Sequence, residues 1–313
     1  MDFLHLISTA NIPPQFLKSA FLAGHVPYKA LASDPRVSYK LYIPPEHLNA
    51  NPSDPTQQLP ILPLVVVIHG TRRTSETLKT IAPWSHTHPC AILVPLFPSG
   101  LDGPNDIDSY KLLSSKTLRS DLALLSMLDE VSQRWPGIAT EKIFLAGFSG
   151  GGQFAQRFFY LYPERLHAVS IGAPGRVTRL DRTLDWPQGI KNVQEKFSMS
   201  VDFEKLKAVT AIQLIVGGED TVVHGGEEFS KWLEEARKSR NKKDSDSDTS
   251  SDQLAPMRVG RVQLTKETFE EWKAIGIEAR FDVVPGVAHN PQGVVNVVLS
   301  FLQPLVAHVY GQQ

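Results

Sequence analysis

The run Ile143-Phe144-Leu145-Ala146-Gly147-Phe148-Ser149-Gly150-Gly151-Gly152 carries an apolar stretch into the motif G-x-S-x-G. Residues 153–159 then follow a helix-like pattern, which places the motif at a turn from a strand into a helix. A serine hydroxyl is a poor nucleophile unless a sharp turn projects it and a base takes its proton, and the flanking glycines let that crowded turn form. The stretch therefore predicts a nucleophile elbow with Ser149 at its tip.

The composition is that of an ordinary globular protein. The chain has 313 residues, of which 42% are apolar and 21% charged, and its formal net charge is -1. This balance differs from that of disordered chains, and it indicates no nucleic-acid partner. Since an α/β fold of this size is commonly one domain, we expect a single domain over residues 1–313.

The sequence favours a cytoplasmic protein with no membrane partner. No apolar run reaches the roughly 18 residues of a membrane-spanning helix, and residues 1–5 lack the basic and long apolar regions of a signal peptide. Cys90 is the single cysteine, so no disulfide can form within the chain, and no Asn-x-Ser/Thr sequon free of proline occurs. Both observations agree with a reducing compartment.

Apolar runs separated by polar loops predict a series of strands. Residues 36–43 alternate in a way that suits a half-buried edge strand, and the β-branched run 64–68 is typical of a strand covered on both faces. Similar runs predict further strands over 91–94, 142–146, 166–171, 211–216 and 279–284.

Helical patterns lie between these strands. In residues 118–128, the side chains of Leu118, Leu122, Leu125 and Leu128 recur at three- and four-residue steps, which predicts one apolar helix face. Strands and helices that alternate through short connections imply an α/β fold, with a mainly parallel central sheet and helices on both faces. Other helices are predicted over 15–22, 227–237, 266–275 and 294–309.

Residues 237–252 interrupt this alternation with a basic half, a Ser-Asp half and no apolar residue. A segment that buries no apolar surface cannot offset the entropy lost on ordering. We therefore expect a disordered surface insertion over residues 237–256. Its basic half also resembles a nuclear localisation patch, and its Ser-Asp half resembles a kinase substrate.

A catalytic serine needs an imidazole base, and the imidazole needs a carboxylate that fixes its tautomer. After a nucleophile elbow, the acid and then the histidine follow along the chain. Asp220 comes after the predicted strand 211–216 and the turn Gly217-Gly218, so we expect it to be the acid. Its neighbour Glu219 is the alternative, interpreted as a solvent-facing charge.

Three histidines follow Asp220 in the chain. His289 comes after the predicted strand 279–284 and leads into the last helix, so a loop at the same sheet edge would carry it over the nucleophile. We expect His289 to be the base. His224, only four residues beyond the acid, and His308, on the terminal helix, are the alternatives.

A further requirement is a pair of donors for the charge that develops on a carbonyl oxygen under attack. The amide of Gly150, just after the nucleophile, is one donor. The other is expected from the loop after the strand 64–68, where Thr71 or Arg72 would donate. We interpret His69 in the same loop as a bracing side chain.

At these residues the chain resembles the α/β-hydrolase superfamily: His69-Gly70, Gly147-Phe148-Ser149-Gly150-Gly151, Asp220 and His289 look like its motifs. The resemblance covers residues 36–309, and the segment between Gly175 and Thr210 leaves no room for a large cap domain. Within the superfamily the chain is similar to small carboxylesterases and polyhydroxyalkanoate-depolymerase-like esterases. The resemblance implies that a small-molecule carboxylic ester is hydrolysed through an acyl-enzyme on Ser149, without a cofactor.

Other interpretations stay open at this point. A biosynthetic enzyme could use the same base and oxyanion site for condensation, cyclisation or carbon–carbon cleavage, and a binding protein could keep the fold without turnover. Arg72 and Arg73 could pair with a substrate carboxylate. His86 and Cys90 belong to metal-binding residue types, but their spacing matches no closed zinc site, so we expect no metal. The sequence gives no indication of oligomeric state.

Overall fold

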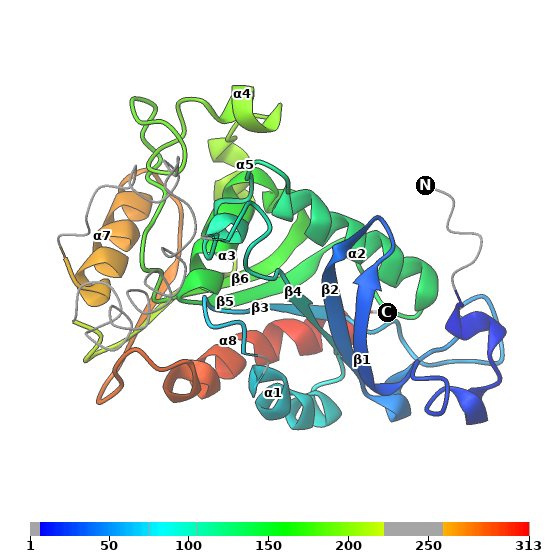
Figure 1. Ribbon diagram of the computed structural model, residues 1–313. Helices are drawn as coiled ribbons and strands as arrows, with labels where there is room; N and C mark the ends of the chain where they lie inside the picture. The colour runs from blue at the N-terminus through cyan, green and yellow to red at the C-terminus, as the bar shows by residue number, and fades with distance from the viewer. Residues whose placement is uncertain (1–6, 75, 105, 222–258, 313) are drawn as a thin grey trace.

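The centre of the molecule is a twisted sheet with helices on both faces (Figure 1). The computed structural model describes residues 7–74, 76–104, 106–221 and 259–312. In these ranges eight strands form one sheet, in the order β1-β2-β4-β3-β5-β6-β7-β8. The strands are β1 Gly24–Leu31, β2 Asp34–Ile43, β3 Leu64–Ile68, β4 Ala91–Leu96, β5 Ile143–Phe148, β6 Leu166–Gly172, β7 Ile212–Gly217 and β8 Arg280–Val284.

The sheet is mainly parallel, as the alternating pattern predicted. β2 is antiparallel to both of its neighbours, β1 and β4, whereas every other pair of neighbouring strands is parallel. The carboxyl ends of β3 and of β5 to β8 therefore lie at one edge of the sheet. Residues that follow these strands come together there, although they are far apart in the sequence.

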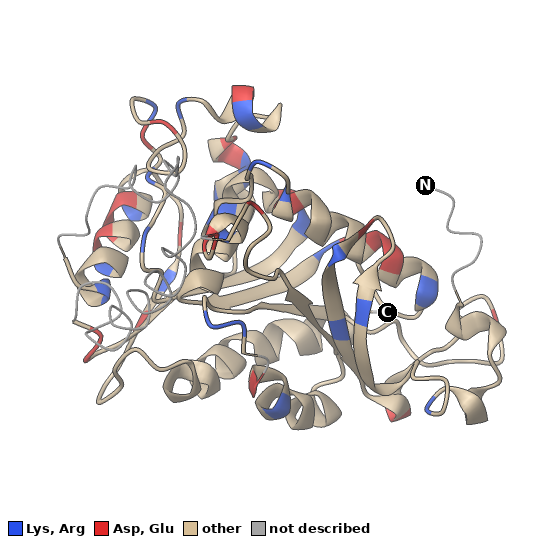
Figure 2. Cartoon of the chain, in the orientation of Figure 1, with Lys and Arg blue, Asp and Glu red and all other residues tan. Residues whose placement is uncertain are grey.

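The helices form two layers (Figure 1). α2, α3 and α7 cover one face and α1 and α8 the other, and α7 packs against β7 and β8 beside α3. The helices are α1 Glu76–Thr87, α2 Ser120–Arg134, α3 Gly150–Leu161, α4 Val193–Phe197, α5 Phe203–Ala208, α7 Arg261–Ala274 and α8 Pro291–Gly311. Lys, Arg, Asp and Glu residues occur along α2, α4 and α7, whereas α8 contains none (Figure 2).

β3 shows why a continuous β-branched run marks a central strand. Leu64, Val66 and Ile68 pack into the core beneath α2 and α3, and the intervening Val65 and Val67 pack into the core beneath α1 and α8. Because alternate side chains point to opposite faces, only a strand covered on both sides needs apolar residues at every position.

The prediction that residues 36–43 form the edge strand is wrong. β1 lies outside β2, and Pro27 within β1 explains why the sequence pattern conceals it. Proline cannot donate to a ladder and is tolerated on edge strands; the pairing of β1 with β2 shifts register after Val26. The predicted helix over 15–22 is also reduced to a single 3₁₀ turn, Pro14–Phe16.

The buried face of α2 matches the predicted one only in part: Leu118 and Leu128 are buried and Leu125 packs partly buried against the core. Leu122 is 46% exposed, whereas Leu124, Met127, Leu128 and Val131 are buried. Leu118 lies in the loop before α2, so its burial does not determine which face of the helix is buried. The predicted helices over 266–275 and 294–309 correspond to α7 and α8, while the predicted helix over 227–237 and the whole predicted insertion 237–256 lie outside the described residues.

α8 is long and apolar enough to cross a membrane by length and composition alone, which the search for apolar runs did not reveal. In this fold it lies along β5, β6 and β7. Five of its side chains are buried against the sheet: Val294, Val295, Leu299, Leu302 and Val306. Its apolar character therefore has a packing role in the core.

A buried carboxylate joins α2 to the β1–β2 hairpin. Glu130 is fully buried, and its Oε1 accepts hydrogen bonds from the Tyr39 hydroxyl at 2.6 Å and from Arg134 Nε at 3.0 Å. Its Oε2 accepts from the amide of Ala32 at 2.9 Å, in the turn between the two strands. Three donors, of which Arg134 also forms an ion pair, offset the cost of removing this charge from water.

We predict that Glu130→Gln lowers the free energy of unfolding by about 2–4 kcal/mol, because the amide removes the ion pair and turns an N–H group toward existing donors. Asp129→Asn, at the exposed neighbouring position, should change stability by less than about 0.5 kcal/mol. Urea unfolding of both variants checks the prediction. Equal stabilities would show that Glu130 does not hold the hairpin.

Candidate active site

Ser149 occupies a strained turn between β5 and α3. Its backbone has φ 58° and ψ -113°, a conformation that a residue with a side chain adopts only at an energetic cost. The side chain is half-buried and makes no capping hydrogen bond to the helix that follows. The turn thus holds the hydroxyl away from the helix, at the carboxyl edge of the sheet.

The glycines of the motif are required by close contacts between backbone segments. A Cβ on Gly147 would overlap the carbonyl oxygen of Gly151, and a Cβ on Gly151 would overlap the carbonyl oxygen of Ile68 at the end of β3. The first contact closes the turn on itself. The second seats the turn against the neighbouring strand.

Gly151→Ala should therefore destabilise the fold by at least about 2 kcal/mol, because backbone atoms that cannot move aside occupy the space for the methyl group. Gly311→Ala is the matched control, since a Cβ at that helical position meets nothing within 4 Å. Thermal unfolding of the two variants measures the difference. A Gly151→Ala protein as stable as the control would contradict the packing argument.

Asp220 and His289 are brought together by two interlocked loops after β7 and β8. The Gly218 amide donates to Val284 O at 2.7 Å, and the Glu219 amide donates to Val287 O at 2.9 Å. A Cβ on Gly217 would overlap the Val287 carbonyl, so glycine permits this approach. As a result His289 Nδ1 lies 2.6 Å from Asp220 Oδ2.

The Asp220 carboxylate is buried and paired on both oxygens. Its side chain is 1% exposed, and Oδ1 accepts a hydrogen bond from Arg261 NH1 at 3.1 Å. Arg261 begins α7 and is itself buried, so the acid lies between two cationic or donor groups, Arg261 and His289. Glu219, the alternative acid, is exposed.

The His289 ring lies at the same sheet edge as Ser149. It packs against Phe148, the residue before the serine, with 4.9 Å between ring centroids. Ser149, Asp220 and His289 thus follow β5, β7 and β8 respectively. Of the alternative bases, His308 is exposed near the far end of α8, and His224 lies outside the described residues.

Thr71, in the predicted oxyanion loop, lies beside Gly150, the residue after Ser149. A Cβ on Gly150 would lie 3.0 Å from both the amide nitrogen and the Oγ1 of Thr71, and 2.6 Å from the hydroxyl of Tyr110. The Gly150 amide is the first of α3 and has no partner within the helix. Arg72 is exposed, and no contact places it beside Ser149.

His69 and Arg73 brace this loop. His69 lies with Nδ1 2.8 Å from Gly70 O and accepts from the Phe97 amide at 3.1 Å on Nε2, so Nδ1 carries the proton. Arg73 donates to the carbonyls of Phe97, Thr71 and Ile107. The guanidinium of Arg73 is therefore occupied by backbone and not presented to a substrate carboxylate.

Burial makes His69 a source of acid sensitivity. It lowers the pKa of His69 from 6.5 to about 4, so the folded protein keeps the ring neutral where the unfolded chain binds a proton. Stability should fall as the pH drops from about 6.5 to about 4, by on the order of 3 kcal/mol from this group, and should change no further below that range.

The measurement is urea unfolding at several pH values between 4 and 7. His69→Asn should flatten the pH dependence over this range, whereas His308→Asn, at an exposed position, should leave it as in the parent protein. Parallel curves for the parent and the His69→Asn protein would show that His69 is not buried in neutral form.

The residues that suggested a metal have other partners. His86 is hydrogen-bonded to Glu46 and lies 2.6 Å from the Tyr42 hydroxyl, while Cys90 is buried in the core beneath α1. In the described ranges, no group of three or more His, Cys, Asp or Glu side chains could hold a metal ion.

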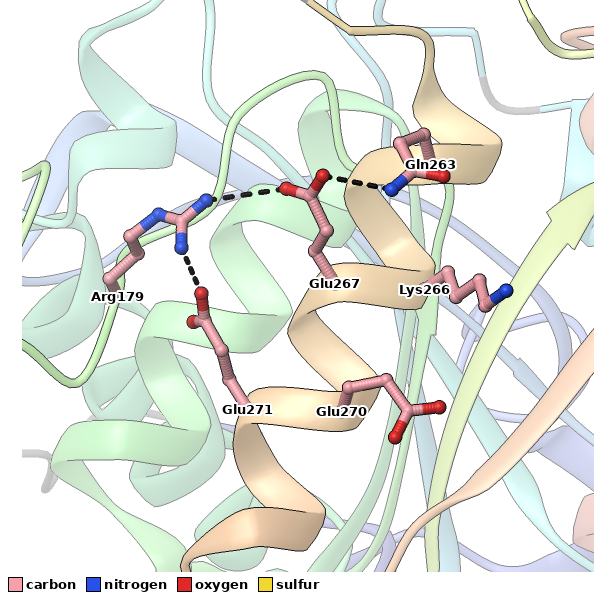
Figure 3. Close-up of a pocket in the computed structure, with 6 residues that line it drawn as sticks. All are labelled: Arg179, Gln263, Lys266, Glu267, Glu270 and Glu271. Carbon is pink, nitrogen blue, oxygen red and sulfur yellow. Dashed lines mark hydrogen bonds and ion pairs between the residues drawn. The ribbon is translucent and has the colours of Figure 1, made fainter.

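A shallow pocket lies on the outer face of α7, away from the residues described above (Figure 3). Arg179 reaches across from the loop after β6 and pairs with Glu271 and, at 3.4 Å, with Glu267. Glu267 also accepts from Gln263. The pocket is lined by this ion-pair cluster, which fastens the loop to the helix.

Comparison with solved structures identifies the fold. The poly(3-hydroxybutyrate) depolymerase LpqC from Bordetella parapertussis superposes with a TM-score of 0.59 at 18% identity, over 94% of each chain. Poly(aspartic acid) hydrolase-1 from Sphingomonas sp. KT-1 gives a TM-score of 0.58 at 18% identity, over 84% of this chain and 92% of its own.

The fluorophosphonate-binding serine hydrolase FphF from Staphylococcus aureus gives a TM-score of 0.54 at 13% identity, over 90% of this chain and 98% of its own. A scan of protein-family models and a sequence search of curated proteins give no match. At these low identities the likeness shows the fold, and the chain has the α/β-hydrolase fold that its motifs predicted.

Two buried cations of this site escaped the sequence analysis. Arg261 follows the polar segment and Lys111 lies in a polar loop, where a lone basic residue gives no local signal. Only the folded structure shows that Arg261 contacts Asp220 and that Lys111 contacts Thr71 at 2.9 Å.

Proposed function

We propose that this protein is a serine hydrolase that cleaves a carboxylic ester through an acyl-enzyme on Ser149. The observation that carries the proposal is the 2.6 Å contact between His289 and the buried Asp220, at the sheet edge where Ser149 holds its strained conformation. These are the acid, base and nucleophile of a catalytic triad, in the chain order of α/β-hydrolases.

The geometry sets the tautomer of the base. Since the Asp220 carboxylate can only accept, His289 Nδ1 carries a proton and donates it, which leaves Nε2 as the acceptor for the serine proton. Asp220 also stabilises the imidazolium that forms during the reaction. Arg261 holds the other carboxylate oxygen and so limits rotation of the acid.

Hydrolysis then proceeds in two halves. Ser149 Oγ bonds to the ester carbonyl carbon, the carbonyl π pair moves to oxygen, and His289 takes the hydroxyl proton. When the tetrahedral intermediate collapses, the alcohol leaves with that proton. Water adds to the acyl-enzyme with His289 as base, and the carboxylic acid leaves Ser149. The amides of Gly150 and Thr71 stabilise the oxyanion in both halves.

Two of the structural neighbours support this chemistry by their names. One is a poly(3-hydroxybutyrate) depolymerase, and another is a fluorophosphonate-binding serine hydrolase. The proposed enzyme needs no cofactor, because every step uses side chains and amides of this chain. We propose a cytoplasmic location from the single buried Cys90 and the absence of a sequon.

The test combines labelling with turnover. A fluorophosphonate probe should label the parent protein and not Ser149→Ala, and a panel of short p-nitrophenyl esters should be hydrolysed. Asp220→Asn and His289→Gln should each lower kcat by roughly 10⁴-fold, since both remove the oriented base. His308→Gln, on an exposed part of α8, serves as the control and should keep full activity.

The outcomes separate the alternatives. Equal labelling of Ser149→Ala and the parent protein would exclude Ser149 as the nucleophile. Labelling of Ser149 without turnover of any ester would point to the non-hydrolytic use of the same site.

A further inference from the structure

Among the described residues, Thr71, beside the proposed oxyanion position, uses both of its acceptor atoms in hydrogen bonds but neither of its donor groups. Both of its acceptors are taken by cations: Arg73 NH1 donates to its carbonyl oxygen at 2.8 Å, and Lys111 Nζ donates to its Oγ1 at 2.9 Å. Within the described part of the chain, neither its amide nor its hydroxyl donates a hydrogen bond. The two donors of Thr71 are thus unused, although the residue is buried.

The contact with Lys111 decides where the hydroxyl proton can lie. An ammonium group has three donors and no acceptor, so Thr71 Oγ1 must accept at this contact. The threonine proton then points away from Lys111. Oγ1 and the amide nitrogen of Thr71 both lie 3.0 Å from the place that a Cβ on Gly150 would take, so both unused donors lie beside the first residue of α3.

Lys111 is held in place from several directions. It is buried, its Nζ lies 2.6 Å from Asp108 Oδ1, and its carbonyl accepts from Arg157 NH1 at 2.6 Å. Burial lowers the pKa of Lys111, and the Asp108 carboxylate opposes this by favouring the ammonium form. A lysine would not be buried here without such a partner.

We propose that the Thr71 hydroxyl is a third donor to the oxyanion, and that Lys111 is the positioning residue that orients this hydroxyl. The proposal rests on the ester hydrolysis proposed above. When Ser149 Oγ adds to the carbonyl carbon, the π pair moves to oxygen, and the O–H of Thr71 and the amides of Thr71 and Gly150 donate to that charge. The contact with the ammonium also polarises the hydroxyl and strengthens it as a donor.

The test compares Thr71→Val with Thr71→Ser. Valine keeps the shape and the backbone amide but removes the hydroxyl, whereas serine keeps the hydroxyl. On p-nitrophenyl esters we expect Thr71→Val to lose roughly 10- to 100-fold in kcat with KM within about twofold, and Thr71→Ser to stay within about threefold of the parent protein.

Lys111→Met tests the positioning role, with Lys116→Met as the matched control at an exposed position of the same loop. Lys111→Met should lower kcat. In a protein that already carries Thr71→Val, it should lower kcat by less than about a further twofold, because Lys111 acts through the hydroxyl that valine lacks. Lys116→Met should change neither kcat nor KM. If Lys111→Met does not fold, the comparison at Thr71 still decides the proposal.

Opposite results would overturn the proposal. An unchanged kcat in Thr71→Val, or an equal loss of kcat in Thr71→Ser, would show that the hydroxyl does not contact the oxyanion. In either case, ester hydrolysis by the parent protein would still support the proposed hydrolase function. Full additivity of the Lys111 and Thr71 changes would remove the positioning role. A parent protein that is neither labelled nor active would instead refute the proposed function itself, and this inference with it.

Discussion

The site depends on backbone segments that meet at the carboxyl edge of the sheet with no room for side chains between them. At Gly151 the turn after β5 packs against the Ile68 carbonyl at the end of β3. At Gly217 the loop after β7 packs against the Val287 carbonyl in the loop after β8. These contacts bring residues 69–71, 149 and 289 to one edge although they are separated in sequence. A glycine at each crossing is the condition for that convergence.

Charge is distributed unevenly around the nucleophile. On the side of the base, the buried Asp220 carboxylate is paired with Arg261 and His289. On the side of the oxyanion loop, Arg73 and Lys111 lie beneath Thr71. In the proposed acyl transfer, positive charge would form on the imidazole and negative charge on the carbonyl oxygen, so each would develop near fixed charge of the opposite sign.

The local sequence pattern was sufficient to predict the turn at Ser149 and the central strands. Ser149 lies in a motif whose flanking strand and helix are readable, and Asp220 and His289 follow apolar runs that become β7 and β8. β1 was missed because proline in an edge strand gives no strand signal. Arg261 was missed because its contact with the acid joins residues 41 positions apart, which no local periodicity records.

The meeting of Gly260 and Thr221 has a consequence for how the chain can change over time. A Cβ on Gly260 would overlap the Thr221 carbonyl, and the Val262 amide donates to Asp220 O at 3.2 Å. Thr221 and Gly260 thus lie side by side next to Asp220, and this contact does not depend on the number of residues between them. Because closing a longer loop costs little additional entropy, insertions and deletions can accumulate there while the acid keeps its place. The number of residues between Thr221 and Gly260 can therefore change during evolution with little effect on the position of Asp220.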